Sequence, residues 1–130
     1  MTLQLKRVYE PPADHDGMRI LVDRLWPRGL SKAEAKIDFW AKAVAPSSTE
    51  LRRWYQHEPE KWPEFQRQYF TELQNNPEAV QQLIAMIGTG NATLLFSAKE
   101  THLNNAAVLK DYLEALLATK RSHTDSIHLD

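Results

Sequence analysis

The chain has 130 residues, 42% of them hydrophobic, and a formal net charge of −1 at pH 7. A chain of this length buries roughly two-thirds of its unfolded surface, so we expect one domain that folds without disulfides. The absence of cysteine excludes disulfides, thiolate nucleophiles and zinc–sulfur sites. No apolar run is long enough to span a membrane, and the N-terminal segment is too charged for a signal peptide, so we expect a cytoplasmic protein that does not contact membranes.

Charge is unevenly distributed along the sequence. Between Arg19 and Arg53 there are eight basic and four acidic residues, a local net charge of +4 that leaves −5 for the rest of the chain. Such asymmetry is typical of a protein that binds phosphate or carboxylate groups, but also of a solvated surface with scattered ion pairs. We therefore consider a small anionic ligand and nucleic acid as partners.

The first predicted strand covers residues 3–9, where apolar and polar residues alternate before Pro11 and Pro12 end the pattern. The connector at residues 10–17 is shorter than the dozen or so residues that a parallel crossover needs. The next strand should therefore be antiparallel to the first or not adjacent to it. Asp14-His15-Asp16 within this connector is an ordinary turn sequence, which we favour over a metal cluster.

The second predicted strand is the centre of the sequence. Ile20-Leu21-Val22 is a β-branched run that suits a strand buried on both faces, and Pro27 and Gly29 prevent its continuation. Polar and aromatic residues follow immediately and so lie at the carboxyl end of the strand: Asp23, Arg24, Trp26 and Arg28. In open α/β sheets, ligands bind most often at this edge.

The rest of the chain is predicted to alternate between helices and one more buried strand. A polar turn or short helix at 31–36 precedes residues 37–40, which fit either a strand or a helix. We then expect helices at 48–57, from the capping box of Ser47 and Glu50, at 62–75 and at 76–88, a strand at 92–97, and a last helix capped by Asn104 or Asn105. The resulting prediction is one α/β domain over residues 1–120, with a small, mostly parallel sheet of three to four strands flanked by helices, followed by a polar tail at 121–130.

A candidate site follows if the strands at 20–22 and 92–97 are neighbours. The second of them also ends in polar residues, and the two ends would then share one crevice. Asp23 or Glu100 is the candidate catalytic base. The candidate ligand-binding residues are Arg24, Trp26, Arg28, Lys99 and Asn104, among which the arginines can grip phosphate or carboxylate with two hydrogen bonds. We predict no metal site, and the sequence identifies no cofactor.

Three alternatives remain open beside this site, which itself fits either an enzyme or a binding protein. The same charged residues fit a structural ion-pair network. The basic first half, with Trp26 and Trp40 as stacking surfaces, fits a nucleic-acid-binding or regulatory module. The aromatic helix from Trp62 to Leu73 fits an oligomer interface.

The string Asp23-Arg24-Leu25-Trp26-Pro27-Arg28-Gly29, together with Arg7–Pro12 and Ala45-Pro46-Ser47, carries a family resemblance. The sequence resembles the YeaO-like branch of a bacterial family of unknown function over nearly its whole length. The resemblance implies a small α/β domain with a largely parallel sheet. Longer relatives of that family carry Cys, Glu, His and Arg near the positions of Phe96 to Asn105, and because this chain has no cysteine, thiol-dependent chemistry does not carry over to it.

Overall fold

A computed structural model describes residues 1–46, 59–99, 101–102 and 104–129 of the chain. The helix expected at 48–57 and the candidate base Glu100 lie outside the described residues. The described strands are β1 (Thr2–Arg7), β2 (Met18–Leu21), β3 (Phe39–Trp40) and β4 (Asn91–Phe96). The described helices are α1 (Lys32–Ala35), α3 (Trp62–Gln74), α4 (Pro77–Ile87) and α5 (Asn105–Leu129), with short 3-10 turns η1 (Asp14–Asp16), η2 (Lys42–Val44) and η3 (Pro59–Lys61).

The four strands form one sheet in the order β1-β4-β2-β3, and every neighbouring pair is parallel. The predicted α/β class with a parallel sheet is therefore confirmed. β1 and β2 are not adjacent because β4 lies between them, which agrees with the short connector between the first two strands. Phe39 and Trp40, ambiguous in the sequence, form a strand because they pair with Ile20 and Leu21.

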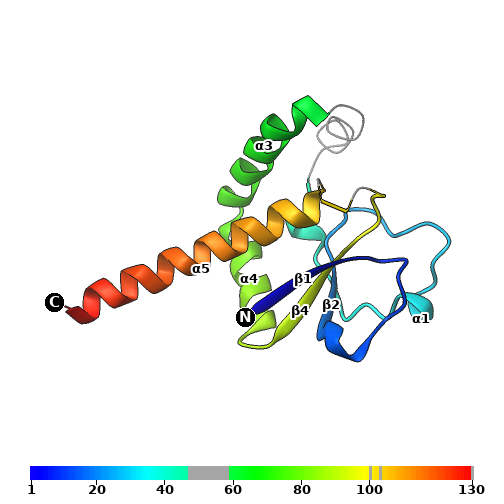
Figure 1. Ribbon diagram of the computed structural model, residues 1–130, viewed down its shortest axis with the longest axis horizontal. Helices are drawn as coiled ribbons and strands as arrows, with labels where there is room; N and C mark the ends of the chain where they lie inside the picture. The colour runs from blue at the N-terminus through cyan, green and yellow to red at the C-terminus, as the bar shows by residue number, and fades with distance from the viewer. Residues whose placement is uncertain (47–58, 100, 103, 130) are drawn as a thin grey trace.

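One face of the sheet is covered by helices. Alternate strand residues point toward them and pack with α3, α4 and α5 in the main hydrophobic core, which includes Leu3, Ile20, Val22, Leu94 and Phe96. Figure 1 shows these three helices on one side of the sheet and α1 on the other. A smaller cluster on the opposite face joins Val8, Leu21 and Leu95 to Trp26, Leu30, Ile37 and Trp40. The loop after β2 therefore takes the place of a long helix on that face.

The opposite face also contains a buried ionic cluster. The Asp16 carboxylate, 1% exposed, accepts from the Lys6 ammonium at 3.2 Å and from Arg19 Nη1 at 2.5 Å. Arg19 Nη2 donates to the carbonyl oxygen of Ala35 at 2.8 Å, at the carboxyl end of α1. The turn predicted at 14–16 is confirmed as η1, and its last residue joins the sheet to α1 through Arg19.

α5 is longer than the sequence predicts. Composition favours a polar tail from residue 121, whereas the backbone is helical to Leu129. Neither glycine nor proline occurs after Asn104, so the chain offers no residue that breaks a helix there. Figure 1 shows the carboxyl end of α5 projecting beyond the sheet and the other helices.

Removing the Asp16 carboxylate should destabilise the fold strongly. Asp16→Ala leaves the guanidinium of Arg19 and the ammonium of Lys6 without their buried counter-ion, and we expect the free energy of unfolding to fall by about 3–5 kcal/mol. Urea denaturation followed by circular dichroism measures this change. Glu114→Ala, which breaks the exposed pair with Lys110, is the control and should change stability by less than about 0.5 kcal/mol. Equal effects of the two substitutions would contradict the role given to Asp16.

The same carboxylate predicts acid sensitivity. Burial raises the pKa of Asp16, but the hydrogen bond from the Ala13 N–H and the pairing with Lys6 and Arg19 outweigh burial and hold the pKa below its ordinary value of 3.8. The stabilisation is therefore complete well above pH 3.8 and is lost as pH falls through the lower, folded-state pKa. Urea denaturation from pH 2 to pH 6 should show the advantage of the wild type over Asp16→Asn shrinking toward the acid end. A constant difference would contradict this.

Candidate functional site

The carboxyl ends of the parallel strands meet at one edge of the sheet. β2 and β4 are direct neighbours, with Leu21 paired to Leu95, as the predicted site requires. Asp23 and Arg24 follow β2, and Lys99 follows β4, so all three belong to this edge. Their side chains nevertheless have different surroundings.

Asp23 connects three elements through hydrogen bonds from neutral donors. Its Oδ2 accepts from the backbone N–H of Ser97 at 2.8 Å and from the Ser97 hydroxyl at 2.7 Å, and its Oδ1 accepts from Asn105 Nδ2 at 3.0 Å. Asn105 Nδ2 also donates to the carbonyl of Val22 at 2.9 Å. The carboxylate thus joins the end of β2 to the end of β4 and the start of α5. Within the described part of the chain it pairs with neither an arginine nor a lysine, in contrast to the ion-pair alternative.

Asn104 caps α5. Its side-chain oxygen accepts from the backbone N–H of Ala107 at 2.9 Å, and the residue is fully buried. The prediction that Asn104 or Asn105 caps the last helix is thereby confirmed, with Asn104 as the cap. Because the side chain lies inside the protein, it does not line the cavity described below.

Trp26 and Trp40 stabilise the loop that follows β2. Their rings are T-shaped at 5.5 Å between centroids. Trp26 Nε1 donates to the carbonyl of Leu30 at 2.6 Å, and Trp40 Nε1 donates to the carbonyl of Asp23 at 2.7 Å. Both rings pack against the cluster of Val8, Leu21 and Leu95. The two indoles are held against the protein rather than presented as a flat stacking surface.

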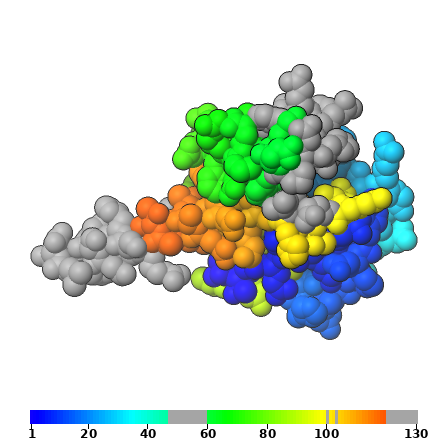
Figure 2. Space-filling view, turned by 45° about the horizontal axis from the view of Figure 1, so that its top comes forward, coloured from blue at the N-terminus to red at the C-terminus, as the bar shows by residue number. Residues whose placement is uncertain are grey.

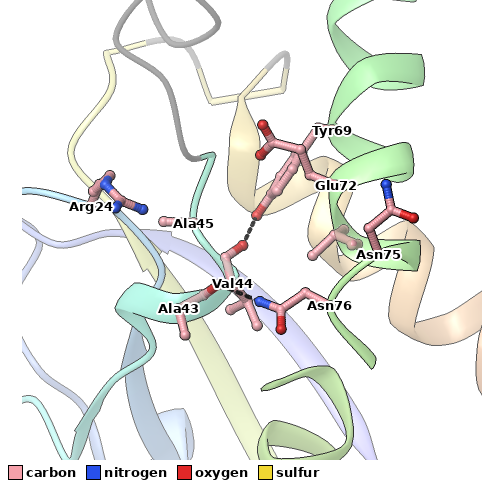
Figure 3. A pocket seen from close by; sticks show the side chains of 9 residues that line it. Arg24, Ala43, Val44, Ala45, Tyr69, Glu72, Asn75 and Asn76 are labelled. Carbon is pink, nitrogen blue, oxygen red and sulfur yellow. Dashed lines mark hydrogen bonds between the residues drawn. The ribbon is translucent and has the colours of Figure 1, made fainter. Parts of the chain in front are cut away.

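Arg24 lines a cavity at the sheet edge (Figure 3). The cavity has a volume of about 250 Å³ and lies between the loop after β2, η2 and the carboxyl end of α3. Its lining residues are Arg24, Ala43, Val44, Ala45, Tyr69, Glu72, Leu73, Asn75 and Asn76. Arg24 itself is half-buried, and its guanidinium makes no hydrogen bond or ion pair with any residue that the structure describes.

Two hydrogen bonds fix the wall of this cavity. The Tyr69 hydroxyl donates to the carbonyl of Val44, and Asn76 Nδ2 donates to the carbonyl of Ala43 at 3.0 Å. Both bonds hold η2 against α3 and the start of α4, as Figure 3 shows. Glu72 and Asn75 add polar groups from α3 and its C-cap. The sequence did not indicate these residues, because the apolar stripe of α3 predicts core packing and gives no sign of which polar neighbours reach a cavity.

The remaining predicted site residues lie on the surface. Arg28 and Lys99 are exposed, and neither lines the cavity. Among the described residues, no group of three or more histidine, cysteine, aspartate or glutamate side chains is placed to hold a metal ion. None of the helices in the described ranges is long and apolar enough to cross a membrane.

Comparisons with known proteins place the chain among uncharacterised bacterial proteins. A family model described as "Inactive DUF488-N3 subclade" matches residues 2–128. The chain is 44% identical over 116 residues to the uncharacterized protein YeaO of Escherichia coli (strain K12), covering 89% of this chain and all of YeaO. It is 39% identical over 111 residues to the uncharacterized protein Rv3073c of Mycobacterium tuberculosis (strain ATCC 25618 / H37Rv), covering 85% of this chain and 92% of that protein. No solved structure matches.

Chemical rescue can test whether the Asp23 carboxylate holds the ends of β2 and β4 and the start of α5 together. Asp23→Ala removes the acceptor shared by Ser97 and Asn105, and we expect a loss of about 2–3 kcal/mol in the free energy of unfolding. Formate can occupy the emptied position between the same donors, so it should restore part of the melting temperature in a saturable manner.

Two controls make the rescue specific. Chloride at equal ionic strength should not restore the melting temperature of Asp23→Ala, and Asp111→Ala, on the exposed side of α5, should neither lose stability nor respond to formate. A wild-type melting temperature for Asp23→Ala would contradict this role of the Asp23 carboxylate.

Proposed function

Because this chain belongs to the inactive DUF488-N3 subclade, we propose that it is a non-catalytic binding protein for a small anionic ligand held by Arg24. Membership also confirms the resemblance to the YeaO-like branch, since the match to YeaO covers all of that protein. The description of the family model as inactive supports a binding role over a catalytic one. The proposal keeps the location at the strand ends and the anionic ligand that the sequence predicts. Of the predicted ligand-binding residues, it retains Arg24.

The observation that carries the proposal is the surroundings of the Arg24 guanidinium. It is half-buried at the wall of the cavity, and no described residue supplies it with a carboxylate or a carbonyl oxygen. Partial burial removes water from a charged group, which is unfavourable unless a counter-ion or acceptor replaces that water. A phosphate or carboxylate of a ligand would supply two acceptors in the plane of the guanidinium.

The shape and composition of the cavity limit the ligand. A volume of about 250 Å³ is below the roughly 300–1,000 Å³ of pockets that hold drug-sized molecules. The lining also includes four apolar residues, Ala43, Val44, Ala45 and Leu73. A small metabolite with one anionic group and a short apolar body fits these properties.

The hydrogen bonds of the Asp23 carboxylate support a role in binding without catalysis. A general base must reach the proton that it removes, whereas both oxygens of this carboxylate accept hydrogen bonds from Ser97 and Asn105. Asp23 is also not among the residues that line the cavity. Its contribution to the proposed function is to position Arg24, its neighbour in the chain.

A thermal-shift screen tests the proposal. The compounds are inorganic phosphate, small carboxylates and phosphate monoesters with a short apolar body, and at least one should raise the melting temperature of the wild type in a saturable manner. Arg24→Ala should reduce the affinity for that compound by about tenfold or more, equivalent to about 1.4 kcal/mol. Arg24→Lys should retain part of it, because the charge stays while the bidentate geometry is lost.

Arg67→Ala is the matched control for Arg24→Ala. It removes a guanidinium from α3 that is exposed, pairs with Glu64 and lies outside the cavity lining, so the ligand-induced shift should be unchanged. If no compound stabilises the wild type, or if Arg24→Ala responds like the wild type, the proposed function is wrong. An oligonucleotide that binds with affinity falling steeply with salt would support the nucleic-acid alternative instead.

A further inference from the structure

The Arg24 cavity has a second charged side chain in its lining, which the proposed function does not use. Glu72 lines the same cavity as Arg24 and is also half-buried. Among the described lining residues Arg24 is the one cation and Glu72 the one anion, and the others are apolar or neutral. Figure 3 shows that the two side chains come from different elements, Arg24 from the loop after β2 and Glu72 from α3. A ligand in the cavity therefore meets charges of both signs.

The helical repeat places Glu72 beside the buried face of α3. Tyr69 and Leu73 are buried residues of this helix, and both also line the cavity. Glu72 follows Tyr69 by three positions, so the two side chains project from the same side of the helix. Figure 2 shows α3, in green, at the surface of the molecule next to α5, in orange, against which it packs. Glu72 thus lies at the border between the buried face of α3 and solvent, where a carboxylate can contact a ligand in the cavity.

The carboxyl end of α3 favours a cation at this side of the cavity. The helix ends at Gln74, and its last turn contains no basic residue. The last carbonyl groups of a helix have a partial negative charge, which stabilises a cation beside the last turn. Glu72 belongs to that turn and adds a full negative charge. Both features attract an ammonium group.

Arg24 and Glu72 do not satisfy each other by direct contact. Both belong to the part of the chain that the structure describes, and no ion pair joins them. A carboxylate has about four acceptor sites on its two oxygens, so Glu72 can accept from a ligand in addition to any group of the protein. A dianionic phosphate between the two residues would be repelled by Glu72, whereas a zwitterion complements both charges.

We propose that the ligand of the Arg24 cavity is a small amino acid, whose carboxylate binds Arg24 and whose ammonium binds Glu72 and the carboxyl end of α3. This ligand class rests on the proposed function, because it adds a second charged group to the ligand of the same cavity. A carboxylate matches the two parallel donors of a guanidinium, and the three donors of an ammonium can be shared between a carboxylate and helix carbonyls. A short amino acid also fits a volume of about 250 Å³ with four apolar lining residues.

Matched ligands test the ammonium group. Valine and isovalerate share one carbon skeleton and differ by the ammonium, as do γ-aminobutyrate and butyrate, in which the two charges lie further apart. Isothermal titration calorimetry with the full chain measures the four affinities. We expect at least one amino acid to bind about tenfold or more tightly than its matched carboxylate. Carboxylates that bind as tightly as both amino acids would overturn the amino acid as ligand and leave the proposed function standing. Equal affinities for valine and α-hydroxyisovalerate would overturn it too, in favour of a hydroxyl group beside Glu72.

Glu72→Gln separates a contact with the ligand from a role in stability. It should weaken binding of the amino acid about tenfold and leave binding of the matched carboxylate unchanged or tighter, because the repulsion from Glu72 is removed. A loss of stability alone would lower the melting temperature of the free protein without changing the ratio of the two affinities.

Glu64→Gln is the matched control for Glu72→Gln. It removes a carboxylate of the same helix that pairs with Arg67 and lies outside the cavity lining, so the ratio of the two affinities should stay at the wild-type value. Equal weakening of amino acid and carboxylate in Glu72→Gln would overturn the contact with the ammonium. Arg24→Ala should weaken both ligands. If it weakens neither, or if no ligand binds the wild type, the proposed function and the amino acid ligand are both wrong.

Discussion

The hydrogen bonds of the Asp23 carboxylate determine the arrangement of the whole sheet edge. One side chain joins the ends of two neighbouring strands to the first turn of α5, by accepting from Ser97 and Asn105. The position of the β2 loop follows from this junction, because Trp40 donates to the Asp23 carbonyl and packs against Trp26. Asp23, the candidate base of the sequence analysis, thus connects the ends of β2 and β4 to the start of α5.

The local pattern of apolar and polar residues was sufficient to predict most of the strands and helices. The apolar runs of β2 and β4, the amphipathic stripes of α3 and α4, and the expected cap at Asn104 or Asn105 predicted elements that the structure confirms. β3 could not be predicted, because Phe39 and Trp40 become a strand only by pairing with β2. The length of α5 was also missed, since polar composition indicates solvation but does not stop a helix. For β3 the deciding factor, pairing with β2, is absent from the local sequence. For α5 it is the lack of glycine and proline after Asn104, which the local sequence does contain.

The sequence predicted that two strand ends meet, but it did not predict the contacts that each side chain makes there. Strand ends that carry Asp23, Arg24 and Lys99 were expected to meet, and they do so because β2 and β4 are neighbours. Sequence adjacency cannot show that Asp23 turns toward Ser97 while Arg24 lines a cavity. The polar residues contributed by α3, Glu72 and Asn75, come from a helix that is distant in the sequence, and only tertiary packing brings them to the cavity.

The buried ionic cluster under α1 has a consequence for strand alignment. Lys6 and Arg19 alternate with the apolar residues Leu5 and Ile20, so each strand presents charge to one face and hydrocarbon to the other. If β1 or β2 shifted its register by one residue, a cation would enter the main hydrophobic core, and an aliphatic side chain would replace that cation beside Asp16. A shifted register therefore costs free energy in two ways, by burying a cation in the apolar core and by removing an ion pair with Asp16. The charges that connect α1 to the sheet also select one register of the strands.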